Sequence, residues 1–198
     1  MGPTARWYRL AMPAWLTDEE YRVLCSACAR MIPADETPGA VEAGVPDYID
    51  GLLGAFSVSP PRIWAGGPTS GRHGGEAAFA RFIELGPLEE LAWRIRIEGS
   101  RGMAEREFNG PVTGWQERYR HGLAALGPDF PDVGEEEQGA RLRAQPAFAR
   151  LLYGHCCEGM YGAPEYGGNR GGRGWAAINF PGDSQPRGYT DEEVSGRD

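Results

Sequence analysis

The chain has 198 residues, of which 41% are apolar, and it carries a net charge of −8. This length allows one domain with a buried core. Nucleic-acid-binding proteins usually carry a clustered basic patch, so an acidic chain with dispersed arginines argues against nucleic acid as a partner. The sequence contains no apolar run of about 18 residues, which argues against direct membrane insertion.

Glycine and proline are abundant, with 30 Gly and 16 Pro, which approaches the composition of low-complexity chains. Six Trp and the apolar content nevertheless argue against disorder. We therefore expect a single domain over residues 1–198 with much irregular structure, and flexible segments at 1–14 and 186–198.

The first predicted helix begins at Thr17, an N-cap residue with Glu20 three positions later, as in a capping box. Apolar residues continue at helical spacing until Pro33 ends the helix. Residues 34–45 are acidic and rich in turn formers. A second helix is predicted over 46–56, with Pro at its first position, where proline is tolerated.

Residues 57–75 are rich in Pro and Gly and predict a long loop, a type of segment that is often functional. Within it, Arg62, Ile63 and Trp64 are expected to anchor the loop either on its own domain or on a partner, and the sequence leaves both alternatives open. Two short helices are predicted next, over 76–85 and 87–98. The second has apolar residues on more than one side, which indicates a largely buried helix.

Further helices are predicted over 115–126 and 135–144, and the last strong helix begins at Pro146. Its apolar face contains Phe148, Leu151, Leu152, His155 and Gly159. No segment alternates between apolar and polar residues as a strand does. The predicted fold class is all-α, an irregular multi-helix domain with long Gly/Pro-rich loops.

The chain from His155 to Gly182 reads HCCEGMYGAPEYGGNRGGRGWAAINFPG, and its central run of glycines predicts a segment that is not helical. Tyr166 and Trp175 flank these glycines. Ordering so many glycines costs conformational entropy. We expect the compensating contacts to come from the aromatic side chains and from a surface outside the chain.

Two blocks of sequence carry a family resemblance. The first is MIPADETPGAVEAGVPDYID, Met31 to Asp50, and the second combines YGGN, GRGW and FPG between Tyr166 and Gly182. Together they resemble the gluconate 2-dehydrogenase subunit 3 family, the small subunits of bacterial flavin-dependent sugar and polyol dehydrogenases. Between the two blocks the chain shows no such match.

The resemblance implies a non-catalytic small subunit, which docks on a large FAD-dependent oxidoreductase of the glucose–methanol–choline type and supports its maturation. The large subunit acts on sugars or related alcohols and holds the FAD. No cofactor is expected in this chain, which lacks a strand–GxGxxG–helix unit. The candidate interface residues are Arg62, Trp64, Tyr161, Tyr166, Gly167, Gly168, Asn169, Trp175 and Phe180.

The alternative function is an independent small enzyme, for example a metal-assisted hydrolase that uses Asp35, Glu36 and His155. His155 lies on the apolar face of its helix, which favours a core histidine. Asn169 is expected to adopt a left-handed conformation or to hydrogen-bond its loop, and Glu158 to cap backbone N–H groups there. In the favoured interpretation no residue is assigned to catalysis, cofactor binding or a metal.

Four cysteines form a CxxC pair, Cys25 and Cys28, and an adjacent pair, Cys156 and Cys157. The CxxC pair falls within a predicted helix and on its apolar stripe, where a free cysteine serves as a small core residue. A disulfide, within the chain or to a partner, and a zinc or iron–sulfur site are the alternatives.

The N-terminal residues do not form a signal peptide, because arginines interrupt a short apolar part. Members of the resembled family often carry a twin-arginine export signal, which is not seen here. We therefore expect a cytoplasmic chain. A periplasmic or exported complex is the alternative if a leader has been removed.

Overall fold

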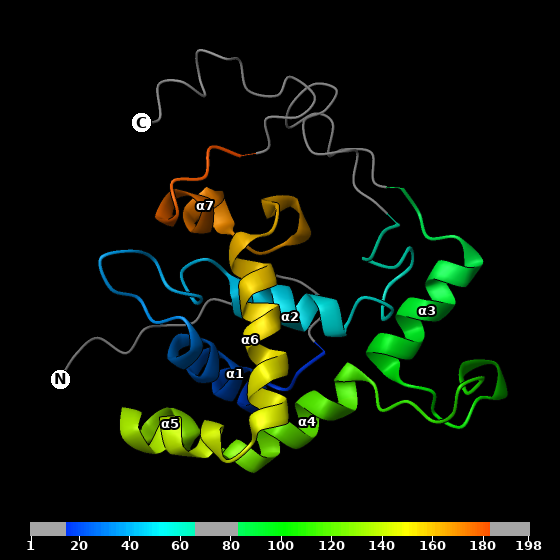
Figure 1. Ribbon diagram of the computed structural model, residues 1–198, viewed down its shortest axis with the longest axis horizontal. Coiled ribbons are helices and arrows are strands. Elements are labelled where there is room, and N and C mark those ends of the chain that lie inside the picture. The colour runs from blue at the N-terminus through cyan, green and yellow to red at the C-terminus, as the bar shows by residue number, and fades with distance from the viewer. Residues whose placement is uncertain (1–14, 66–82, 183–198) are drawn as a thin grey trace.

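The computed structural model describes residues 15–65 and 83–182 (Figure 1). Within these ranges the fold is all-α, as predicted, and no strand is assigned. The α-helices are α1 (Asp18–Met31), α2 (Val45–Leu53), α3 (Pro87–Glu98), α4 (Trp115–Leu126), α5 (Glu135–Arg143), α6 (Pro146–Tyr161) and α7 (Arg173–Ala177). Single 3₁₀ turns are η2 (Ala104–Arg106), η3 (Phe130–Asp132), η4 (Pro164–Tyr166) and η5 (Arg170–Gly172).

Several sequence predictions fall outside the described residues. These are the flexible segments at 1–14 and 186–198, the second part of the loop predicted over 57–75, and most of the helix predicted over 76–85. Residues 83–85, the described end of that last prediction, are not helical. No helix in the described part of the chain is both long and apolar enough to cross a bilayer.

The start of α1 confirms the predicted capping box. The Glu20 amide donates to Thr17 Oγ1 at 3.2 Å, and the Thr17 amide donates to Glu20 Oε2 at 2.9 Å. Two backbone donors that the first turn leaves without helical partners are thereby satisfied. Because all the residues involved lie within four positions, local sequence is sufficient to set this helix boundary.

Helix α6 is the central element of the fold, and it packs against α1, α2, α4, α5 and α7 (Figure 1). The main core forms where α6 meets α1, α2 and α4, and Leu24, Ile49, Tyr119 and Leu152 have no exposed surface there. Burying apolar area of this kind is the main favourable term in folding. The core therefore holds α6 in place. The glycine run begins to fold back at the C-terminal end of this helix.

Helix α3 differs from its prediction as a largely buried helix, because only Ile97 of this helix is buried. Leu88 is 82% exposed. The reason is its position: α3 lies at one side of the molecule and packs mainly on α4 and α2 (Figure 1). Two i,i+4 ion pairs lie along α3, since Arg94 contacts Glu90 at 2.7 Å and Glu98 at 3.3 Å.

The prediction that the glycine run after α6 is not helical is also corrected, because the run contains the 3₁₀ turn η5 and leads into the short helix α7. Asn169, Gly171 and Gly172 have φ values of 44°, 62° and 67°. Residues in this left-handed region reverse the chain, and glycine adopts it at little cost. The glycines thus separate short helical pieces instead of preventing helix formation throughout.

Candidate functional site

The two blocks of sequence that carry the family resemblance pack against each other. The Arg170 amide donates to the Ala43 carbonyl at 3.0 Å, and the Arg170 guanidinium forms an ion pair with Asp47. Arg173 Nη1 donates to the Glu42 carbonyl at 2.8 Å. Segments more than a hundred residues apart in sequence are therefore joined into one surface, which is absent from each block alone.

Asp47 links three parts of this surface. Its carboxylate, on α2, also accepts a 2.6 Å hydrogen bond from the Tyr21 hydroxyl on α1. The Asp47 side chain is only 11% exposed. Burial and the hydrogen bond to Asp47 raise the pKa of Tyr21, so the phenol stays protonated and keeps donating. Charge-assisted hydrogen bonds of this kind are among the stronger ones.

Asn169 stabilises the C-terminal fold-back, the segment of residues 162–177 that returns onto α6. The prediction made for the Asn169 side chain and backbone is confirmed. It has no exposed surface and adopts a left-handed conformation. Its Oδ1 atom accepts from the Gly174 amide at 2.8 Å, and its Nδ2 atom donates to the Gly162 carbonyl at 2.9 Å. One side chain therefore satisfies backbone groups on both sides of the turn, as buried polar groups require.

Glu158 has a different role from the predicted capping of the loop's N–H groups. Its carboxylate accepts a hydrogen bond from the Tyr48 hydroxyl on α2 at 3.1 Å. Only its backbone carbonyl contacts the following turn, by accepting from the Gly162 amide at 2.8 Å. Glu158 thus joins α6 to α2.

Two glycines of the run permit close backbone contact. A Cβ atom at Gly168 would overlap the carbonyl of Gly159, and one at Gly174 would overlap the carbonyl of Met160. Gly159 itself faces Tyr48, whose ring would lie 2.8 Å from an added Cβ. Part of the contact that offsets the ordering of the glycines therefore comes from within the chain.

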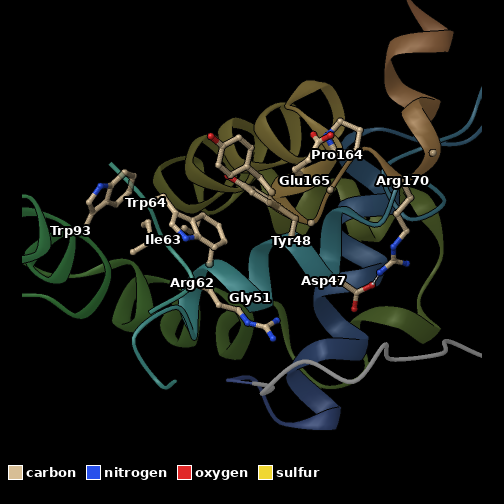
Figure 2. A pocket seen from close by; sticks show the side chains of 15 residues that line it. Asp47, Tyr48, Gly51, Arg62, Ile63, Trp64, Trp93, Pro164, Glu165 and Arg170 are labelled. Carbon is tan, nitrogen blue, oxygen red and sulfur yellow. Dashed lines mark hydrogen bonds and ion pairs between the residues drawn. The ribbon is translucent and has the colours of Figure 1, made fainter. Parts of the chain in front are cut away.

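A groove of about 910 Å³ opens beside this joined surface (Figure 2). Figure 2 shows Trp64 and Trp93 toward one end and the Asp47–Arg170 pair toward the other. The Trp64 and Tyr166 rings lie 6.1 Å apart, centroid to centroid. Five of the nine candidate interface residues line the groove: Arg62, Trp64, Tyr166, Gly167 and Gly168.

The remaining candidates lie elsewhere. Asn169 is buried beneath the surface, whereas Tyr161 and Phe180 are 38% and 40% exposed and group around the half-buried Trp175. The Trp175 indole donates to the Tyr161 carbonyl at 2.7 Å, and its ring lies 5.3 Å from that of Phe180. None of these four lines the groove.

Sequence analysis missed several groove residues, in particular Asp47, Arg170 and Trp93. Asp47 lies in the first family block and Arg170 in the second. Their opposite charges were the available sequence signal for a contact between the blocks. Trp93 gave no such signal, because its helix shows no sequence link to either block.

The residues of the alternative hydrolase do not form a site. His155 is buried in the core, where its Nδ1 atom and the Tyr119 hydroxyl lie 2.9 Å apart. Asp35 lies on an exposed turn and accepts from the Thr37 amide at 2.8 Å. Across the described residues, which include Glu36, no group of three or more His, Cys, Asp or Glu is placed to hold a metal ion. The prediction of a core histidine is confirmed.

His155 makes the stability of the fold depend on pH. Burial, with a smaller contribution from Arg118, lowers its pKa to about 4, below the usual value of about 6.5. The unfolded chain therefore binds a proton that the folded chain does not, as the pH falls from about 6.5 to about 4. The contribution of His155 to the free energy of unfolding is fully present above about pH 6.5 and is lost as the pH falls towards about 4.

We expect His155→Gln to reduce the loss of unfolding free energy between pH 7 and pH 4.5 by about 2 kcal/mol. Urea denaturation at pH 7 and at pH 4.5 measures the free energy of unfolding at each pH, and their difference is this loss. His121→Gln, at an exposed histidine, is the matched control and should leave the loss unchanged. Equal pH dependence in wild type and His155→Gln would contradict the prediction.

Comparison with known proteins gives one result. Residues 18–182 match the family model described as Gluconate 2-dehydrogenase subunit 3. The match covers most of the chain and includes both joined blocks. No curated protein and no solved structure matches the chain significantly.

Proposed function

Because the chain belongs to the gluconate 2-dehydrogenase subunit 3 family, we propose that it is a non-catalytic small subunit that docks on a large FAD-dependent oxidoreductase. The large subunit is of the glucose–methanol–choline type and acts on sugars or related alcohols. The small subunit supports its maturation and stability. In this proposal the FAD belongs to the large subunit, and this chain holds no cofactor.

The observation that carries the proposal is the groove lined by Trp64 and Tyr166. Tryptophan, tyrosine and arginine concentrate at the centres of protein interfaces, where a large aromatic ring in a desolvated pocket contributes much of the affinity. Here two such rings and Arg62 meet on one groove. The exposed Tyr161 and Phe180 offer further apolar area for the same partner.

The base of the groove favours docking without rearrangement. The Asp47–Arg170 ion pair and the buried Asn169 fix the loop that carries Tyr166. A surface held in place before binding avoids the ordering cost that a flexible one must meet. The joined blocks therefore serve as a support that presents Tyr166 beside Trp64.

We expect Trp64→Ala combined with Tyr166→Ala to weaken assembly with the large subunit at least about 30-fold, because a single interface hot spot is worth about 2 kcal/mol or more. The dissociation constant is measured with the co-expressed large subunit after separation. Turnover per assembled complex should stay close to that of wild type.

Tyr153→Ala is the matched control, since Tyr153 is 53% exposed on α6 and does not line the groove. The melting temperature of each isolated variant separates a lost interface from a lost fold. An unchanged dissociation constant for the double variant, or reduced turnover in intact complexes, would refute the proposed docking site.

A further inference from the structure

We propose that Cys28 and Cys156 form a disulfide that joins α1 to α6 when the chain folds under oxidising conditions. Their Sγ atoms lie 3.8 Å apart, and neither residue has any exposed surface. The two cysteines come from different pairs of the sequence, one from the CxxC and one from the adjacent pair. Their positions in the sequence are 128 residues apart.

The geometry favours the Cys28–Cys156 pairing over one that uses Cys157. A disulfide bond is about 2.05 Å long, so the two Sγ atoms need to approach by about 1.8 Å. Helices α1 and α6 pack directly on each other. Cys157 is half-buried and hydrogen-bonds with Tyr153, an exposed residue of α6. Cys157 therefore lies away from the contact between Cys28 and Cys156.

The folded, reduced protein protects these thiols. Burial raises the pKa of Cys28, which keeps it a thiol, and the thiolate is the form that attacks a disulfide. An oxidant in solution also has no access to a fully buried sulfur. The bond therefore forms while the chain folds, before α1 and α6 close on each other, and it persists once the core has formed.

Glutathione disulfide is a sufficient oxidant for this step. The thiolate of one cysteine attacks it, forms a mixed disulfide and releases one glutathione. The thiolate of the other cysteine then attacks the protein sulfur of the mixed disulfide and releases the second glutathione. Two protein thiols are oxidised, and one glutathione disulfide is reduced to two glutathione thiols.

The bond would stabilise the surface proposed for docking. Helix α6 carries Gly159 and Met160, whose carbonyls the C-terminal fold-back approaches, and α1 carries Tyr21, which donates to Asp47. Linking α1 to α6 closes a long loop in the unfolded chain, and loops of this length give the larger stabilisations. This inference does not depend on the identity of the partner.

The experiment refolds the denatured, reduced full-length chain in a glutathione redox buffer and, in parallel, in dithiothreitol. We expect the free thiols to fall from four to two in the redox buffer, with mass spectrometry identifying the Cys28–Cys156 link. The melting temperature should rise by roughly 5–15 °C over that of the reduced protein. Folded, reduced protein placed in the same buffer should keep the thiols of Cys28 and Cys156 reduced.

Cys157→Ala should retain the link, whereas Cys156→Ala should abolish it and the gain in melting temperature. Mapping the wild-type chain decides the question even if a variant fails to fold. Four free thiols after oxidative refolding, or a link that uses Cys25 or Cys157, would overturn the proposal.

Discussion

Gly174→Ala is expected to lower the free energy of unfolding by about 3 kcal/mol, the upper part of the range for overpacked sites. The added Cβ would overlap the Met160 carbonyl, a backbone atom of α6 that cannot rotate away. Helix α7 must then move off α6. This movement breaks the 2.8 Å hydrogen bond from the Gly174 amide to Asn169.

Urea denaturation measures the global loss, and hydrogen exchange of the Gly174 amide detects local release of α7. Gly154→Ala is the matched control, because Gly154 lies within α6 and an added Cβ there meets nothing within 4 Å. It should stabilise the protein by about 0.5–1 kcal/mol through helix propensity. Unchanged stability and unchanged exchange in Gly174→Ala would show that α7 does not need this close approach.

Asn169→Ala is expected to cost about 3–4 kcal/mol, because it leaves a buried N–H and a partly buried carbonyl without these partners. The affected groups are the Gly174 amide and the Gly162 carbonyl. A further part of the cost, about 1 kcal/mol, comes from placing alanine in the left-handed conformation that asparagine tolerates. Urea denaturation gives the total.

Asn179→Ala separates these two contributions. Asn179 also has a positive φ, 54°, but it is exposed. This variant therefore reports the conformational cost alone and should lose about 1 kcal/mol. If the two variants lose equal amounts, the buried hydrogen bonds of Asn169 contribute nothing measurable.

Both predictions concern the same structural feature, the fold-back of residues 162–177 onto α6. Loss of this fold-back would also release Arg170 from Asp47 and shift Tyr166 away from Trp64. If the proposed docking is correct, assembly with the large subunit should therefore weaken in Gly174→Ala and Asn169→Ala, but only as far as the fold-back is lost. The Trp64 and Tyr166 variants differ, because they remove contact area and leave the support intact.

Features that depend on neighbours along the chain could be predicted from the sequence. Thr17 and Glu20 set the start of α1, and apolar spacing placed α4 and α6 and the buried face that includes His155. The left-handed conformation of Asn169 was also predictable, since asparagine in a glycine-rich turn tolerates it. Each of these follows from interactions within about four residues.

The places where these elements meet could not be predicted from the sequence and depend on the tertiary fold. The exposure of α3 depends on its position beside α4 and α2, which its own apolar pattern does not contain. The glycines at 168 and 174 are required by carbonyls of α6. The groove is lined at one end by Arg170 and Asp47, which meet across 123 positions of sequence. These contacts form between distant segments that core burial brings together, whereas local sequence encodes only the interaction energies of nearby residues.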